Sequence, residues 1–69
     1  MISNYTVQGM TCEHCVHAVT EEVSNIEGVE QAVVDLSSGS LQVTSAEPID
    51  FAKIEAAVDE AGDYTVSAA

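Results

Sequence analysis

The stretch NYTVQGMTCEHCVHAVTEEVSNI, residues 4–26, changes its hydrophobic period partway along, and this change decides the fold. Tyr5 and Val7 alternate with polar residues, which predicts a strand over residues 4–8 that Gly9 ends. The apolar side chains beyond the loop recur at spacings of 3, 4 and 3, as on one face of a helix: Val16, Val19, Val23 and Ile26. The stretch therefore predicts a strand, a short loop and a helix.

The next part of the chain predicts a β-hairpin. Alternating apolar residues predict strands over residues 29–36 and 40–45, and the small residues at 37–39 predict a tight turn between them. The side chains expected to face inward from these two strands are Ala32, Val34, Leu36, Leu41 and Val43.

A second helix is predicted to begin after Asp50 and to end before Gly62, because Asp is a favoured N-cap and Gly favours helix ends. Its apolar stripe again has spacings of 3, 4 and 3: Phe51, Ile54, Val58 and Ala61. Thr11 is the expected N-cap of the first helix, and a last short strand is predicted over residues 64–67. The order β-α-β-β-α-β predicts an α+β ferredoxin-like sandwich, with two helices on one face of a four-stranded antiparallel sheet.

The composition predicts a single small domain over residues 1–69 and restricts its partners. Twelve acidic residues stand against one basic residue, Lys53, which gives a net charge of −11. Such a surface repels phosphate, so nucleic acids and anionic membranes are poor partners. The acidity either attracts a basic protein surface or only maintains solubility, and both readings stay open.

No apolar stretch approaches the ~20 residues that cross a membrane, so no membrane insertion is expected. The first residues lack the basic and apolar regions of a signal peptide. A cytoplasmic location is therefore expected, where cysteines stay reduced and bind metals or react more often than they form structural disulfides.

Cys12 and Cys15 are the only cysteines, and they flank the start of the first predicted helix. The partial positive charge of a helix N-terminus stabilises thiolates, which are the metal-binding form of cysteine. Soft sulfur ligands favour Cu(I) over hard ions, whereas a structural zinc site usually has four protein ligands. The pair therefore predicts a metal site for one soft ion, most simply Cu(I).

The motif GMTCEHC over residues 9–15 resembles the G-M-T-C-x-x-C signature of heavy-metal-associated domains. Gly28-Val29, Val34-Asp35-Leu36 with Gly39, and Ala61-Gly62 resemble later parts of the same family, so the resemblance covers nearly the whole chain. The length and the first methionine resemble a free-standing bacterial copper chaperone more than a domain of a pump.

This resemblance implies a carrier and not an enzyme. It implies that Cys12 and Cys15 bind Cu(I) and release it when a cysteine of the partner attacks the ion through a three-coordinate intermediate. The implied partner is a copper-exporting P-type ATPase, with a copper-responsive repressor as a further acceptor. The chain would be a monomer without metal, and two copies could share Cu(I) through four thiolates.

Four further residues are candidate auxiliaries of the two sulfurs. Met10 either packs under the loop, as the resemblance implies, or supplies a third soft ligand. Thr11 is expected to shape the loop. His14 either faces solvent, binds the ion directly as a further ligand, or assists it from the second coordination sphere or by bridging a dimer.

Tyr64 is the fourth candidate. The family often has Tyr directly after the Ala-Gly pair, but here Asp63 intervenes. Either Tyr64 still fills the family position near the metal loop, or Asp63 lies beside the ion and Tyr64 covers the sheet edge.

Three other functions compete with a Cu(I) carrier. The same pair could carry Zn²⁺, Cd²⁺ or Hg²⁺, although zinc-binding relatives have an acidic residue where this chain has Thr11. A thiol-disulfide redox protein would resemble thioredoxin, but this chain has no Trp and no proline between the cysteines. An adaptor that uses only its acidic faces would need no metal.

Overall fold

The computed structural model describes all 69 residues, Met1–Ala69. Its elements follow the predicted order: β1 (Ile2–Gln8), α1 (Glu13–Ser24), β2 (Val29–Asp35), β3 (Ser40–Ser45), α2 (Phe51–Ala61) and β4 (Thr65–Ala68). None of the helices combines the length and the apolar character that a membrane span requires.

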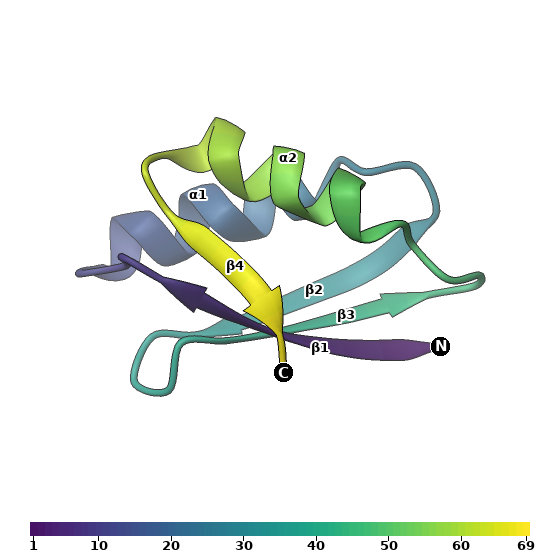
Figure 1. The fold of residues 1–69 in the computed structure, drawn as a ribbon, viewed down its shortest axis with the longest axis horizontal. Helices are drawn as coiled ribbons and strands as arrows, with labels where there is room; N and C mark the ends of the chain where they lie inside the picture. The colour runs from purple at the N-terminus through teal and green to yellow at the C-terminus, as the bar shows by residue number, and fades with distance from the viewer.

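The four strands form one antiparallel sheet in the order β2-β3-β1-β4, and both helices lie on the same face of it (Figure 1). The ferredoxin-like prediction is therefore confirmed. β1 lies between β3 and β4, so the strand that leads into the cysteine loop is hydrogen-bonded on both sides. β1 begins two residues earlier than predicted, because Ile2 and Ser3 also pair with β3.

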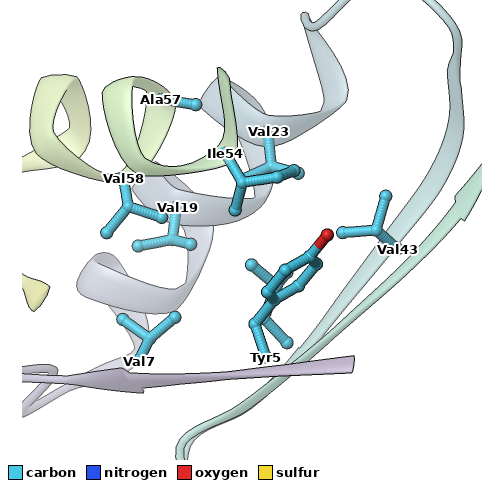
Figure 2. Close-up of a cluster of buried hydrophobic side chains, with 9 residues drawn as sticks. Tyr5, Val7, Val19, Val23, Val43, Ile54, Ala57 and Val58 are labelled. Atoms are coloured by element: carbon cyan, nitrogen blue, oxygen red, sulfur yellow. The ribbon is translucent and has the colours of Figure 1, made fainter. Parts of the chain in front are cut away.

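The core lies between the sheet and the two helices, and the predicted apolar stripes supply most of it (Figure 2). Nine hydrophobic residues are buried: Tyr5, Val7, Val19, Val23, Leu41, Val43, Ile54, Ala57 and Val58. Val16 is half-buried near the start of α1. Ile26, predicted on the same helix, lies beyond its end at Ser24 but still packs against the core.

Two predicted core residues are exposed instead. Phe51 is 38% exposed, and its ring lies 6.0 Å from that of Tyr5 at the margin of the core. Ala57, which is not part of the predicted stripe, is buried instead. Leu36 is 36% exposed because β2 ends at Asp35. The Asp35 carboxylate accepts hydrogen bonds from the backbone N–H and the hydroxyl of Ser37, which starts the turn early.

The predicted helix caps have different outcomes. The N-cap of α1 is Cys12, so the prediction of Thr11 is wrong. The Cys12 carbonyl accepts the first helical hydrogen bonds, from the N–H groups of Cys15 at 3.1 Å and Val16 at 3.4 Å. Asp50 is the N-cap of α2 as predicted, although its side chain makes no capping hydrogen bond.

The β2–β3 turn packs against β1 just before the cysteine loop. Gly39 has φ +73°, and its carbonyl accepts a hydrogen bond of 2.7 Å from the N–H of Val7. A Cβ atom at residue 39 would lie 2.8 Å from the Val7 carbonyl oxygen, which is closer than real contacts allow. Glycine here therefore lets the turn hold the last residues of β1 in place.

Candidate metal site

The two cysteines lie where the chain passes from β1 into α1, at the end of the molecule that also contains the α2–β4 connection (Figure 1). Both thiols are free, and their Sγ atoms are 3.7 Å apart. Cys12 is exposed and Cys15 is half-buried. The structure therefore brings the two predicted sulfurs together at a surface that another molecule can reach.

The surroundings of Cys15 favour its thiolate form. The backbone N–H of Thr11 contributes most to this effect, followed by the hydroxyl of Tyr64 and by groups of Cys12. These hydrogen bonds lower the pKa of Cys15 to about 6. The Thr11 hydroxyl also lies 3.9 Å from the Cys15 sulfur. Cys15 is therefore largely a thiolate at neutral pH, which is the state that binds soft metals.

Tyr64 lies at the site although it precedes β4. The interaction of its hydroxyl with the nearby Cys15 side chain raises the pKa of the tyrosine. Its ring lies against two glycines: a Cβ at Gly62 would be 2.8 Å from the ring, and a Cβ at Gly9 would be 3.2 Å from it. Tyr64 is half-buried and Asp63 is exposed. Which of the two residues assists a bound ion stays a prediction.

The remaining candidates lie around the loop without joining the sulfurs. Met10 is half-buried and packs against the hydrophobic core, which fits its expected supporting role. His14 is exposed. No group of three or more His, Cys, Asp or Glu side chains converges anywhere in the structure, so His14 does not form a ready third donor with Cys12 and Cys15.

The separation of the sulfurs can be compared with metal–sulfur geometry. With bonds of ~2.3 Å, a tetrahedral angle would place two sulfurs ~3.8 Å apart, and a linear arrangement ~4.6 Å apart. The observed 3.7 Å matches the first value. The linear arrangement requires the two sulfurs to move apart by roughly 1 Å. Cys12 precedes the first helical turn and is exposed, so its side chain can rotate to allow this.

Two supporting features were not predicted from the sequence. One is the backbone N–H of Thr11, whose direction depends on the loop conformation. The other is the packing of the Tyr64 ring against Gly9 and Gly62. Both glycines are visible in the sequence, but nothing in it shows that they contact the same ring.

A ferredoxin-like sandwich with two free cysteines close together at the start of its first helix defines a class of small metal-binding domain. The model of the heavy-metal-associated domain family matches residues 4–63, and the chain belongs to this family.

Relatives of similar length share much of the sequence. The chain is 43% identical to the COP-associated protein of Helicobacter felis over 56 residues, which are 81% of this chain and 85% of that protein. It is 35% identical to the copper chaperone CopZ of Bacillus subtilis over 57 residues, which are 81% of this chain and 83% of that protein.

Two further comparisons extend the relationship. A copper-transporting ATPase of Rhizobium meliloti is 37% identical over 62 residues, which are 90% of this chain and only 8% of the ATPase. The solved structure of a CopZ metallochaperone superposes with a TM-score of 0.88 at 29% identity and covers 97% of this chain and 100% of that one.

Proposed function

We propose that this chain is a copper chaperone that binds one Cu(I) ion through Cys12 and Cys15. The observation that supports this most directly is the pair of free sulfurs, 3.7 Å apart at the surface, with no third His, Cys, Asp or Glu converging on them. A soft ion that accepts low coordination is satisfied by two thiolates, whereas zinc usually takes four ligands. The names of the relatives, a COP-associated protein and a CopZ copper chaperone, agree with this cargo.

Release of the ion follows from the same exposure. A thiolate of the acceptor approaches the open side of Cu(I) and forms a third Cu–S bond. One Cu–S bond to the chaperone then breaks, and the freed thiolate takes up a proton or stays ionised. A second acceptor sulfur repeats the exchange, so the ion crosses without ever being free and without change of oxidation state. This exchange makes the chain a carrier and not an enzyme.

The acceptor we propose is the metal-binding domain of a copper-transporting P-type ATPase. This proposal rests on the kinship of the chain with a segment of the Rhizobium meliloti ATPase, because a similar domain would offer a similar pair of sulfurs. The exchange requires reduced thiols, which fits the proposed cytoplasmic location. A copper-responsive repressor as a further acceptor, and a dimer bridged by Cu(I), remain predictions.

The structural role of Tyr64 in this function is to hold Cys15 as a thiolate. Its hydroxyl lowers the pKa of Cys15, and its ring lies against Gly9 and Gly62. The residue is a positioning residue, because it reaches the ion only through Cys15.

The cargo can be tested by competition with the Cu(I) chelator bathocuproine disulfonate under anaerobic, reducing conditions. We expect the chain to withdraw one Cu(I) per molecule from the chelator, and the Cys12→Ser/Cys15→Ser variant to withdraw none. His14→Ala is the matched control and should keep the stoichiometry. Tight binding by the double serine variant would overturn the assignment.

A second cargo, Zn²⁺ or a similar ion, is favoured by one observation: the 3.7 Å sulfur separation matches a tetrahedral ion. Two of its four positions would then be filled by water or by a second molecule. A zinc indicator separates the two proposed cargoes. If the chain is a Cu(I) carrier, addition of one equivalent of Cu(I) to the Zn²⁺-loaded chain should displace the Zn²⁺, which the indicator then detects.

A further inference from the structure

A groove of about 540 Å³ runs between α2 and β4 and reaches Tyr64 at the metal end. Its α2 wall carries two carboxylates, Glu55 and Asp59, four residues apart and therefore on one side of the helix. Ala52 and Ala56 lie between and beside them and leave the wall shallow. The groove therefore combines small side chains with negative charge.

The other wall of the groove is the open edge of β4. β4 pairs only with β1, and the N–H of Ala69 donates to the Asn4 carbonyl at 3.2 Å. Antiparallel pairing alternates, so Thr65 and Ser67 direct their backbone groups toward β1 as Ala69 does. The N–H and C=O groups of Val66 and Ala68 therefore face outward from the sheet, and Val66 lies in the lining of the groove.

This edge differs from the other edge of the sheet. β2 carries Glu30 and Asp35, and its pairing with β3 is irregular between Val29 and Gln31. Charges and bulges of this kind are how proteins discourage strand addition. β4 has the sequence Thr-Val-Ser-Ala, with no charge, no proline and no register shift. Its only protection is its length of four residues.

The charges select the occupant of the groove. A second copy of the chain would bring its own Glu55 and Asp59 and a net charge of −11, so the carboxylates of the groove would repel it. The short edge supplies few hydrogen bonds, so a bound strand needs contacts with the α2 wall as well. Lys or Arg side chains projecting over Glu55 and Asp59 provide these contacts.

We infer that the β4 edge and the α2 groove form a docking site for an extended basic segment of a partner protein, which adds as a fifth strand beside β4. Alternate side chains of the segment would lie over the carboxylates of α2. One end of the segment would lie beside Tyr64, next to the sulfurs, so docking would place the partner at the metal site. The inference does not depend on which metal the cysteines carry.

The test uses the ¹⁵N-labelled, reduced, metal-free chain and a capped nonapeptide of alternating Arg and Val at low ionic strength. We expect amide shifts at Val66, Ala68 and the α2 residues of the groove. The same peptide with alternate amides N-methylated cannot pair with β4 and should bind at least tenfold more weakly. Equal binding of the two peptides, or shifts spread over both helices, would show simple charge attraction and overturn the inference.

Two variants separate the contributions of charge and edge. Glu55→Gln/Asp59→Asn should weaken peptide binding about tenfold, as expected for the loss of two exposed ion pairs. The control Glu21→Gln/Glu27→Gln makes the same change in net charge outside the groove, leaves the charges of β2 in place and should weaken binding less than twofold.

Ala68→Pro removes an outward N–H without touching the pairing with β1, and proline is tolerated at such edge positions. We expect it to abolish peptide binding while the remaining amide spectrum is kept. If Ala68→Pro unfolds the chain, the N-methylated peptide still decides the question on the unchanged protein. Concentration-dependent shifts of β4 amides without any peptide would mean that a second copy occupies the edge, which contradicts the inference.

Discussion

Replacement of Ile54 by alanine should unfold a large fraction of the metal-free chain, and Cu(I) should restore the fold. Ile54 is 0% exposed and lies on α2 within the core cluster (Figure 2). An Ile→Ala change at such a position costs about 2–5 kcal/mol. A core of this size supplies a total stability of only about 3–5 kcal/mol, so the two quantities nearly cancel.

Binding of Cu(I) adds stability by mass action. At a free ion concentration ~1,000-fold above the dissociation constant, the gain is ~4.1 kcal/mol if the unfolded chain does not bind. The unfolded chain keeps both cysteines, so its residual affinity reduces the gain. The folded state still binds better, because Cys12 and Cys15 are held 3.7 Å apart at the start of α1. We therefore expect a net gain of at least ~2 kcal/mol.

The assay is far-UV circular dichroism with urea titration, under anaerobic conditions and with Cu(I) buffered by a chelator. Ile54→Ala should show weak helical signal without metal and near-native signal with Cu(I). Ile54→Val, which costs about 0.5–1.5 kcal/mol, should be folded in both states. Two results would refute the reasoning: a stable metal-free Ile54→Ala protein, or equal rescue in the Cys12→Ser/Cys15→Ser background.

Three further predictions concern the site, the turn and docking. The rate of Cys15 alkylation by iodoacetamide, measured in the Cys12→Ser variant, should rise with pH through a midpoint below that of a free thiol. Tyr64→Phe should move this midpoint upward, because the thiolate loses a hydrogen-bond donor; an unchanged midpoint would contradict that role of Tyr64. Gly39→Ala should lower the free energy of unfolding by about 2–4 kcal/mol in urea, from the strain of a positive φ, the contact with the Val7 carbonyl and a weakened hydrogen bond, whereas a loss below ~0.5 kcal/mol would argue against this. Association with the metal-binding domain of a copper-transporting ATPase should slow as salt rises, measured by stopped flow, since the net charge is −11; a salt-independent rate would exclude electrostatic steering.

The order of the elements could be predicted because each element has a simple burial pattern. Strands with one buried face and helices with one buried stripe leave periods of 2 and 3.6 in the sequence. Ile54 and Val58 follow that rule and are fully buried. Phe51 does not, because it begins α2 at the margin of the sheet, where the core no longer covers the helix. A period identifies a face but not where along the element its burial ends.

The candidate site was predictable only as far as its chemistry is local. The positions of Cys12 and Cys15 follow from one motif and the start of one helix. The N-cap was assigned to Thr11 because its hydroxyl is a common capping group. In the structure the chain turns into the helix one residue later, and the Thr11 backbone contributes most to the lowered pKa of Cys15. The position of Tyr64 depends on its contact with Gly9, more than 50 residues earlier in the chain, and a local sequence pattern cannot predict such a contact.

The structure combines a firmly held loop with only two sulfur ligands, and this combination would suit the proposed carrier. The Gly39 turn fixes the end of β1, Met10 packs into the core and the Tyr64 ring contacts Gly9, so the loop needs little ordering when the metal arrives. Stronger binding could be obtained by adding a third donor to the loop. A third donor would also fill the position that the acceptor's sulfur must attack, and would therefore slow transfer. Two sulfurs on a rigid, exposed loop would hold the proposed Cu(I) ion and leave that position open.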